Sequence, residues 1–368
     1  MYIDRNYYSL SSKDKNLLDK KLKNIIASKK FINSKSVNNF ENKFSRYLNI
    51  KYTVGYSSAS TAISALVDIF CKKDFKKEII IPAFSPLPVV MAIKNFGYKV
   101  KFVDVDKDTF LIDIDRTINS ITKRSKVIMP VHLFGNVVDI KKLRSKLRKN
   151  IFIIEDSSQS HFSKLNNINT GNKGDASVFS FYPTKNLGAY GDAGAITTNN
   201  LNIANTARAY RNYGLHPIKN KIMTLGNNFR MDEIQAEILS INLNYVSLQN
   251  KKRNLLAKRY IYNLKDAPVK FQKINKNVKT NYHVFAILVE EKKRNRLYNY
   301  LKKNNINCII YYEKPLPFLF EKNKKELKSK FKNSYSLSKK IIALPISPYL
   351  TFQNIDFISE KIRNFFLR

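Results

Sequence analysis

Acidic residues are scarce in this 368-residue chain, in which 28 Asp and Glu stand against 66 Lys and Arg and give a formal net charge of +38. Such an excess permits partners such as nucleic acid or a membrane surface. The basic residues are nevertheless spread along the whole sequence, and Lys, Asn and Ile are abundant throughout. This distribution favours a compositional origin over a nucleic-acid-binding stripe or tail, and we expect the charge to favour an anionic substrate.

Cysteine and histidine are also rare. The two cysteines, Cys71 and Cys308, lie far apart, which argues against a disulfide framework and fits a reducing compartment. The four histidines are scattered, so no zinc signature is present.

Long apolar runs are missing as well. The longest, residues 79–93, is interrupted by Pro82, Pro86 and Pro88 and is too short to span a bilayer. The first residues lack the basic start and apolar run of a signal peptide. We therefore expect a cytoplasmic protein that contacts no membrane.

The first two thirds of the chain predict a mostly parallel α/β sheet. Its length suggests two domains, and 43% hydrophobic residues indicate a globular protein. Short apolar, β-branched runs alternate with segments of helical period, which is typical of a parallel sheet covered by helices on both faces. The predicted strands are residues 78–82, 99–104, 126–131, 151–155, 177–181 and 193–198, and the predicted helices are residues 61–71, 89–95 and 140–147.

The rhythm changes after a long helical pattern at residues 231–263. A smaller α+β unit is expected there, with strands at 282–290 and 307–312 and helices at 292–304, 334–342 and 354–366. We therefore predict a large domain over residues 1–245, including an N-terminal helical segment, and a small C-terminal domain over residues 246–368.

Two polar segments follow predicted strands of the sheet. In residues 153–161 (IIEDSSQSH) a strand delivers Asp156 to its carboxyl end, where ligands bind in such sheets. In residues 180–194 (SFYPTKNLGAYGDAG) Lys185 precedes three glycines within seven positions, which imply close backbone approach or positive φ. Taken alone, a strand-end Asp is often a helix cap, and a lysine in so basic a chain is often a solvated surface group.

Two further polar segments open helices. Residues 57–62 (SSASTA) place small hydroxyl side chains at a helix N-terminus, which is either an anion site or simple N-capping by Ser60. Residues 226–235 (GNNFRMDEIQ) open the long helix and also read as a cap.

Taken in order, these segments resemble the DegT-type sugar aminotransferase family, which has the fold type I PLP scaffold: a large domain with a mostly parallel sheet and a smaller α+β domain. Residues 180–194 resemble the family's Ser-Phe-x-x-x-Lys-x-Leu-Gly-x-x-Gly-Asp-x-Gly signature almost throughout. Residues 156–159 resemble its Asp-x-x-Gln element, and residues 226–231 its Gly-x-Asn-x-Arg-Met element. Weaker matches in the same order are residues 39–41, 131–135 and 343–348.

The resemblance implies a role for each matching residue. Lys185 would carry pyridoxal 5'-phosphate (PLP) covalently, Asp156 would pair with its ring nitrogen, and Gln159 would lie against the ring or its phenolic oxygen. The phosphate would be held by the positions of Ala59 and Ser60 and by Ser180. Asn228 would reach the phosphate of a neighbouring subunit, which implies a homodimer with shared active sites.

Several positions depart from the family pattern. Pro86 stands where the family often has an aromatic ring stacked on the cofactor, and Phe84, two positions earlier, is a candidate substitute. Ala59 and Ala193 replace common glycines, and Pro317 stands where a histidine is expected. These differences bear on cofactor affinity and substrate choice more than on reaction type.

The expected function is therefore a PLP-dependent transfer of an amino group from L-glutamate to a keto group of a nucleotide-linked deoxysugar, as in amino-sugar biosynthesis for a surface polysaccharide or similar glycan. Some members of the family dehydrate sugars with a histidine in place of the lysine, and Lys185 argues against that branch. An aminotransferase acting on a cyclitol or another small keto compound remains an alternative. A second alternative, from a different class, is a nucleic-acid-binding or regulatory protein that keeps a relic aminotransferase fold, although no helix-turn-helix or aromatic-basic patch supports it.

Overall fold

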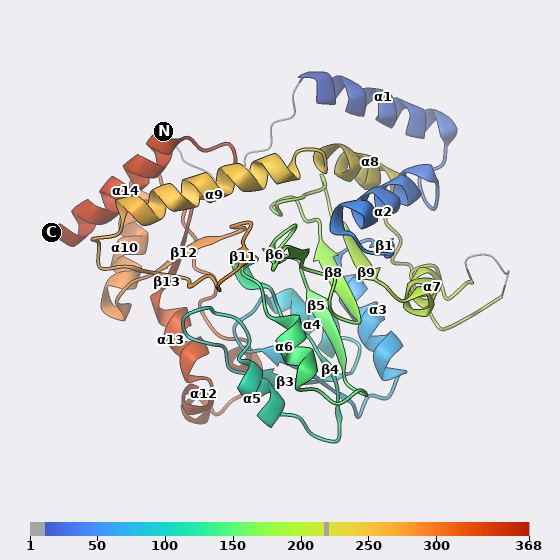
Figure 1. Ribbon diagram of the computed structural model, residues 1–368, viewed down its shortest axis with the longest axis horizontal. Coiled ribbons are helices and arrows are strands. Elements are labelled where there is room, and N and C mark those ends of the chain that lie inside the picture. The colour runs from blue at the N-terminus through green and yellow to red at the C-terminus, as the bar shows by residue number, and fades with distance from the viewer. Residues whose placement is uncertain (1–11, 217–220, 368) are drawn as a thin grey trace.

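A seven-stranded sheet forms the centre of the protein. The computed structural model describes residues 12–216 and 221–367 (Figure 1). The strands of this sheet are β1 (Tyr52–Tyr56), β2 (Glu78–Pro82), β3 (Lys99–Val103), β4 (Ser125–Ile128), β5 (Phe152–Asp156), β8 (Ala176–Ser180) and β9 (Gly194–Thr198). They lie in the order β1-β9-β8-β5-β4-β2-β3. All neighbours from β8 to β3 are parallel, whereas β9 is antiparallel to β8 and β1. The predicted mostly parallel sheet is confirmed.

Helices cover both faces of this sheet. They are α2 (Lys35–Leu48), α3 (Ala59–Cys71), α4 (Leu87–Lys94), α5 (Ile114–Asn119), α6 (Ile140–Ser145), α7 (Leu201–Tyr210) and α8 (Glu233–Asn242). Successive residues of β2 enter different cores, since Ile79 and Ile81 join the α3 side and Ile80 joins the opposite side. This is the arrangement that a continuous apolar strand in a doubly covered sheet requires. Helix α1 (Ser12–Ser28) packs on α8 through Leu18.

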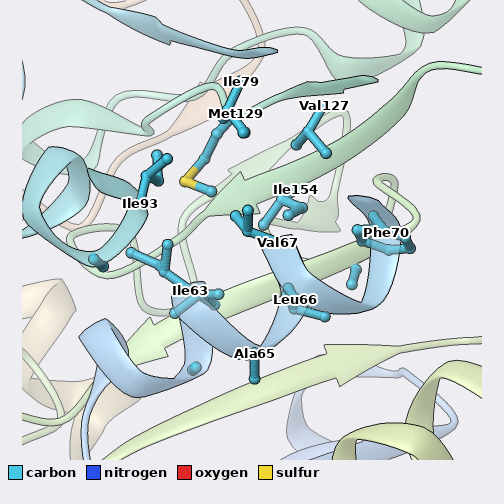
Figure 2. Close-up of a cluster of buried hydrophobic side chains, with 14 of the residues drawn as sticks. Ile63, Ala65, Leu66, Val67, Phe70, Ile79, Ile93, Val127, Met129 and Ile154 are labelled. Carbon is cyan, nitrogen blue, oxygen red and sulfur yellow. The ribbon is translucent and has the colours of Figure 1, made fainter. Parts of the chain in front are cut away.

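The α3 side of the core shows why the sheet is rigid beneath its carboxyl edge. Figure 2 shows Ile63 and Val67 of α3 beside Val127 of β4, Met129 just after β4, and Ile154 of β5. All five side chains are at most 2% exposed. Burying each such side chain stabilises the fold by about 1.5–3 kcal/mol. The start of α3 is therefore held firmly against the end of the sheet.

A second, smaller sheet lies in the C-terminal part, where β10 (Lys270–Phe271), β12 (Phe285–Leu288) and β13 (Ile341–Leu344) pair in the order β10-β12-β13. A third has the order β11-β6-β7, from β6 (Lys164–Leu165), β7 (Ile168–Asn169) and β11 (Val278–Lys279). The C-terminal helices are α9 (Val246–Asn263), α10 (Glu291–Lys303), α11 (Pro317–Phe320), α12 (Lys324–Lys330), α13 (Lys332–Lys340) and α14 (Phe352–Leu367). A domain boundary near residue 245 stays a prediction.

The long helix predicted over residues 231–263 is wrong, because α8 and α9 are separate helices. Between them, the N–H groups of Asn244 and Tyr245 bond to carbonyls three residues back. The side chain of Asn242 donates to the Gly188 carbonyl (2.9 Å), and Asn244 accepts a hydrogen bond from Lys43 (2.7 Å). Asparagine is a weak helix former, and here both side chains bond to other parts of the chain.

Two C-terminal predictions also need correction. The strand predicted at residues 307–312 is wrong, since only Ile309 bridges to Ala343 of β13 before the chain turns away. The helix predicted at residues 334–342 ends at Lys340, and its last two residues belong to β13, which pairs with β12. At the apolar end of residues 334–342, pairing with β12 decides the structure, although the spacing of apolar residues there is that of a helix.

Within residues 12–216 and 221–367, no helix combines the length and the apolar character needed to cross a membrane.

Candidate active site at the carboxyl edge of the sheet

Asp156 is the last residue of β5 and lies at the carboxyl edge of the parallel sheet. Its backbone is fixed on both sides, because its N–H donates to the Pro130 carbonyl (2.9 Å) and its carbonyl accepts from the His132 N–H (3.1 Å). The residue is only 2% exposed. One carboxylate oxygen accepts from the Ser158 N–H (3.0 Å), and the other has no hydrogen bond from any residue of the described ranges. A buried carboxylate in this state calls for a cationic partner.

The start of α3 lies at the same edge. Ser58, and not Ser60 as the capping alternative proposed, is the N-cap residue, and it forms a capping box with Thr61. The N–H groups of Ala59 and Ser60 have no hydrogen-bond partner among the residues that the structure describes. Free N–H groups at the positive end of a helix dipole form a binding site for an anion.

Gly194 joins this helix start to Ser180. In the antiparallel pair of β8 and β9, Gly194 lies opposite Ser180, which is 9% exposed at the end of β8. A Cβ atom on Gly194 would come within 2.4–2.6 Å of backbone atoms of Ser58 and Ala59. Only glycine permits this approach. The spacing of glycines after Lys185 thus includes one position required by close backbone contact.

Lys185 lies in the loop that follows β8. Its backbone N–H donates to the Tyr182 carbonyl (2.8 Å), and the residue is half-buried. The fully buried ring of His161 packs beside Phe179 and Phe181, with centroid distances of 5.6 and 5.8 Å. Burial, and then the positive charge of Lys185, lower the pKa of His161 to about 3. A neutral imidazole therefore lies within electrostatic range of the Lys185 amine.

Gln159 connects the Asp156 turn to Tyr312, a residue that the sequence analysis did not single out. The side-chain oxygen of Gln159 accepts from the Phe134 N–H (2.8 Å), and its amide nitrogen donates to the Tyr312 hydroxyl (3.3 Å). Burial raises the pKa of Tyr312, and the negative charge of Asp156 adds to this. Tyr312 therefore stays a neutral phenol near both side chains. Tyr312 lies five residues before Pro317, where the family pattern has a histidine, and only this nearness to a family position could have signalled it.

Phe84 is 1% exposed and lies edge-on against Tyr312, with ring centroids 5.4 Å apart at 68°. Pro86, the position of the missing aromatic ring, is the N-cap residue of α4. Pro317 is buried at the start of α11. Phe84 thus supports the half-buried ring of Tyr312 from the core side.

Asn228 lies next to the helix start within its own chain. The carbonyl of the following residue, Phe229, accepts from the Ser57 N–H (2.9 Å). The Asn228 side chain is exposed and accepts from Arg230 Nε (3.0 Å). Its role toward a second subunit stays a prediction.

No cluster of three or more His, Cys, Asp or Glu among the described residues is arranged to hold a metal ion. The chemistry of the edge is instead that of free N–H groups, a hydroxyl, a carboxylate and an amine. The sequence profile of the DegT/DnrJ/EryC1/StrS aminotransferase family matches residues 12–363. The protein belongs to this family.

Members of the DegT/DnrJ/EryC1/StrS family are similar to this chain over almost its whole length. It is 32% identical to dTDP-3-amino-3,6-dideoxy-alpha-D-galactopyranose transaminase of Aneurinibacillus thermoaerophilus, with 93% of each chain covered. It is 29% identical to 3-oxo-glucose-6-phosphate:glutamate aminotransferase of Bacillus subtilis, covering 93% of this chain and 78% of that protein.

The crystal structure of NtdA from Bacillus subtilis, with bound cofactor PMP, matches with a TM-score of 0.87 and 26% identity, covering 98% of this chain and 83% of that one. The predicted family and the predicted aminotransferase-like fold are therefore confirmed. This chain is an enzyme of the aminotransferase class.

Proposed function

We propose that this protein is a PLP-dependent aminotransferase that moves an amino group from L-glutamate to a keto group of a nucleotide-linked deoxysugar, in the biosynthesis of an amino sugar. One observation carries the proposal. Free N–H groups at the start of α3, the Ser180 hydroxyl, a buried Asp156 with one unbonded oxygen and Lys185 all belong to the carboxyl edge of one sheet. This is the set of groups that a phosphorylated, cationic, aldehyde-bearing ring needs.

The helix start fits the cofactor phosphate. The N–H groups of Ala59 and Ser60 would donate to it, and Ser180, opposite Gly194, would add a hydroxyl. A phosphate bound by dipoles and hydroxyls needs no lysine or arginine. The basic residues of this chain therefore remain available for the diphosphate of the substrate.

Asp156 fits the ring nitrogen. Its buried carboxylate would hold that nitrogen in the protonated form, and Gln159 would contact the ring or its phenolic oxygen. When bound, PLP supplies an electron sink that lets the Cα–H bond of an amino acid break. Asp156 makes that sink effective by keeping the ring cationic.

Lys185 would hold the cofactor covalently through Nζ and release it when an amino acid arrives. The released Nζ would then take the proton from Cα of the donor and deliver it to the cofactor carbon, as a general base and then a general acid. In the second half of the reaction the same amine moves the proton in the opposite direction, as the keto substrate receives the amino group.

The acceptor is inferred from charge and from the relatives. A net charge of +38 favours an anionic substrate, and the transaminase of Aneurinibacillus thermoaerophilus is named for a dTDP-linked sugar. A second candidate is a smaller keto compound, such as a cyclitol or a sugar phosphate. The Bacillus subtilis relative named for 3-oxo-glucose-6-phosphate favours it, and its name also supports glutamate as the donor.

Assembly and location follow from the same proposal. We propose a homodimer in which the exposed side chain of Asn228 reaches the cofactor phosphate of the other subunit. The small domain would begin near residue 245, where the chain passes from α8 to α9. A cytoplasmic location agrees with two free, buried cysteines, Cys71 and Cys308.

Replacement of Lys185 tests this function directly. Lys185→Ala should abolish the visible absorption band that PLP gives when covalently bound, and should lower the rate of amino transfer by at least about 10³-fold. Lys149→Ala, which removes an exposed lysine that precedes β5, at the opposite end of this strand from Asp156, should leave both unchanged. Absorption spectra after dialysis against PLP and a coupled assay for 2-oxoglutarate measure the two effects. Unmodified protein that stays colourless with PLP would overturn the assignment.

An acceptor panel separates the two substrate candidates. The protein is first converted with glutamate and then mixed with nucleotide-linked keto-sugars, keto-sugar phosphates and keto-cyclitols. Mass spectrometry should find an aminated product from a nucleotide-linked sugar. Amination of a sugar phosphate or cyclitol alone would replace the first candidate with the second.

A further inference from the structure

Asn186, the residue after Lys185, is tied by its side chain to two distant parts of the chain. Its amide nitrogen donates to Asn250 Oδ1 of α9 (2.8 Å) and to the Asn281 carbonyl (3.1 Å). Its oxygen lies 3.0 Å from Nδ1 of His283, just before β12. Asn186 is only 4% exposed. The backbone that carries the proposed catalytic lysine is thus held from one side by buried hydrogen bonds.

The same partners also hold the turn that follows Asp156. The side-chain nitrogens of Asn250 and Asn281 both donate to the His161 carbonyl, at 3.0 and 3.2 Å. His161 lies five residues after Asp156, in the turn that begins there. We call the connected set the amide bridge; its members are His161, Asn186, Asn250, Asn281 and His283.

The directions of these hydrogen bonds fix one another. The carbonyls of Asn281 and His161 can only accept, so the amide nitrogens of Asn186 and Asn250 must face them. The Asn186 oxygen is then an acceptor, and Nδ1 of His283 must carry a proton. Rotating any one amide would leave two donors or two acceptors facing each other in a buried place. The bridge therefore has a single arrangement.

We propose that Asn186 is a positioning residue, held by Asn250 and His283, that sets where the Lys185 amine lies relative to Asp156. One arm of the amide bridge reaches the Asp156 turn through His161. The others reach α9 and the segment before β12, beyond residue 245. The bridge thus fixes the lysine loop against the carboxylate and against the C-terminal part at once. This inference rests on the proposed role of Lys185.

Proton transfer is sensitive to such positioning. A misplacement of about 1 Å in a reacting group can lower a rate on the order of 10²-fold. Loss of the Asn186 side chain frees the loop on one side only, so a smaller effect is expected. We expect Asn186→Ala to slow the half-reaction with glutamate by about tenfold, with little change in KM for glutamate.

The test uses one readout that does not need the cofactor. In cofactor-free protein, acetic anhydride labels lysines, and peptide mass spectrometry gives the labelling rate of Lys185 relative to Lys149 in the same molecule. Asn186→Ala and Asn250→Ala should each change this ratio at least about threefold, and the double variant should change it no further, because the residues act as one unit. In protein that has bound PLP, the same variants should shift the pH at which the visible absorption band of the cofactor is half-changed, which is the pH midpoint of the cofactor band.

Asn169→Ala is the matched control. Asn169 is 9% exposed, and its side chain donates to the carbonyls of Tyr47 and Leu48, outside the amide bridge. It should lower the melting temperature without changing the labelling ratio or the pH midpoint. If Asn186→Ala behaves like this control, the bridge only stabilises the fold and the proposal is overturned. If unmodified protein gives no cofactor band, the proposed function fails, while the labelling ratio still decides the role of Asn186.

Discussion

Two adjacent buried carboxylates on β5 differ completely in their surroundings. Glu155 is 1% exposed and Asp156 is 2% exposed, and they point to opposite faces of the strand because side chains alternate along it. Glu155 accepts from Nε2 of His132 (2.9 Å) and from the N–H groups of Gly171 (3.0 Å), Lys173 (2.7 Å) and Gly174 (2.6 Å). Asp156 has one such bond, from Ser158.

The difference separates a structural carboxylate from a functional one. The four hydrogen bonds to Glu155 compensate for the water that its carboxylate loses on burial, and three of them attach the loop of residues 171–174 to β5. Asp156 keeps one oxygen unbonded among the described residues, so that oxygen is available to a cationic group of a bound molecule. Burial alone does not distinguish the two residues. Hydrogen-bond satisfaction does.

The largest expected effect breaks the Asp156 side of the comparison. Asp156→Asn keeps an oxygen for the Ser158 N–H but removes the charge that would face the cofactor ring. Amino transfer should fall on the order of 10²–10³-fold. The cofactor-free protein should be as stable as the unmodified protein, or more stable, because a buried charge is lost. Single-turnover kinetics with glutamate and thermal denaturation without PLP measure the two quantities. A destabilised variant with full activity would reverse the roles assigned here.

The strand-end placement of Asp156 and Ser180 could be predicted from sequence, because an apolar run followed by polar residues is a local signal. The same holds for the parallel sheet and, to within two residues, for the start of α3. The break between α8 and α9 and the strand β13 could not be predicted, since contacts with distant residues decide them. Tyr312 and the partners of Asn186 were missed for the same reason. They reach the edge from segments that lie more than sixty residues away in sequence, and no local pattern marks them.

The next effect breaks the Glu155 side. Nδ1 of His132 accepts from the Val138 N–H (3.0 Å), so the ring proton is on Nε2, which donates a hydrogen bond to the Glu155 carboxylate. Every hydrogen bond from the described residues to the Glu155 carboxylate comes from an N–H donor. In Glu155→Gln the NH2 group of the new amide must face at least one of these donors, and that hydrogen bond is lost. We expect a loss of about 1–3 kcal/mol in the free energy of unfolding, with the turnover of the folded enzyme unchanged.

Glu78→Gln provides the matched control, and urea unfolding at neutral pH compares the two. Glu78 opens β2 and is 8% exposed; it pairs with Arg124 (3.0 Å), whose side chain is 60% exposed, and accepts from the Thr122 hydroxyl (2.8 Å). An ion pair with an exposed partner contributes about 0–1 kcal/mol, so this variant should lose less stability than Glu155→Gln. Equal losses in both variants would show that the hydrogen bonds of Glu155 add nothing specific.

The smallest expected effect is a change with pH in the stability that Glu155 contributes. Burial by itself would raise the pKa of Glu155, but the hydrogen bond from His132 and the N–H groups of Gly174 and Gly171 outweigh it and hold the pKa below its usual value of 4.5. A carboxyl with a depressed folded pKa stabilises the protein above its unfolded pKa, and this contribution is lost as pH falls through the folded value. The stability gap between unmodified protein and Glu155→Gln should therefore be widest at neutral pH and should narrow below about pH 4.5. Urea unfolding of both proteins from neutral pH to about pH 3.5 measures the gap, with Lys149→Ala as the baseline. A gap that widens in acid would mean that Glu155 binds its proton more tightly in the folded state, and the contrast with Asp156 would lose its electrostatic basis.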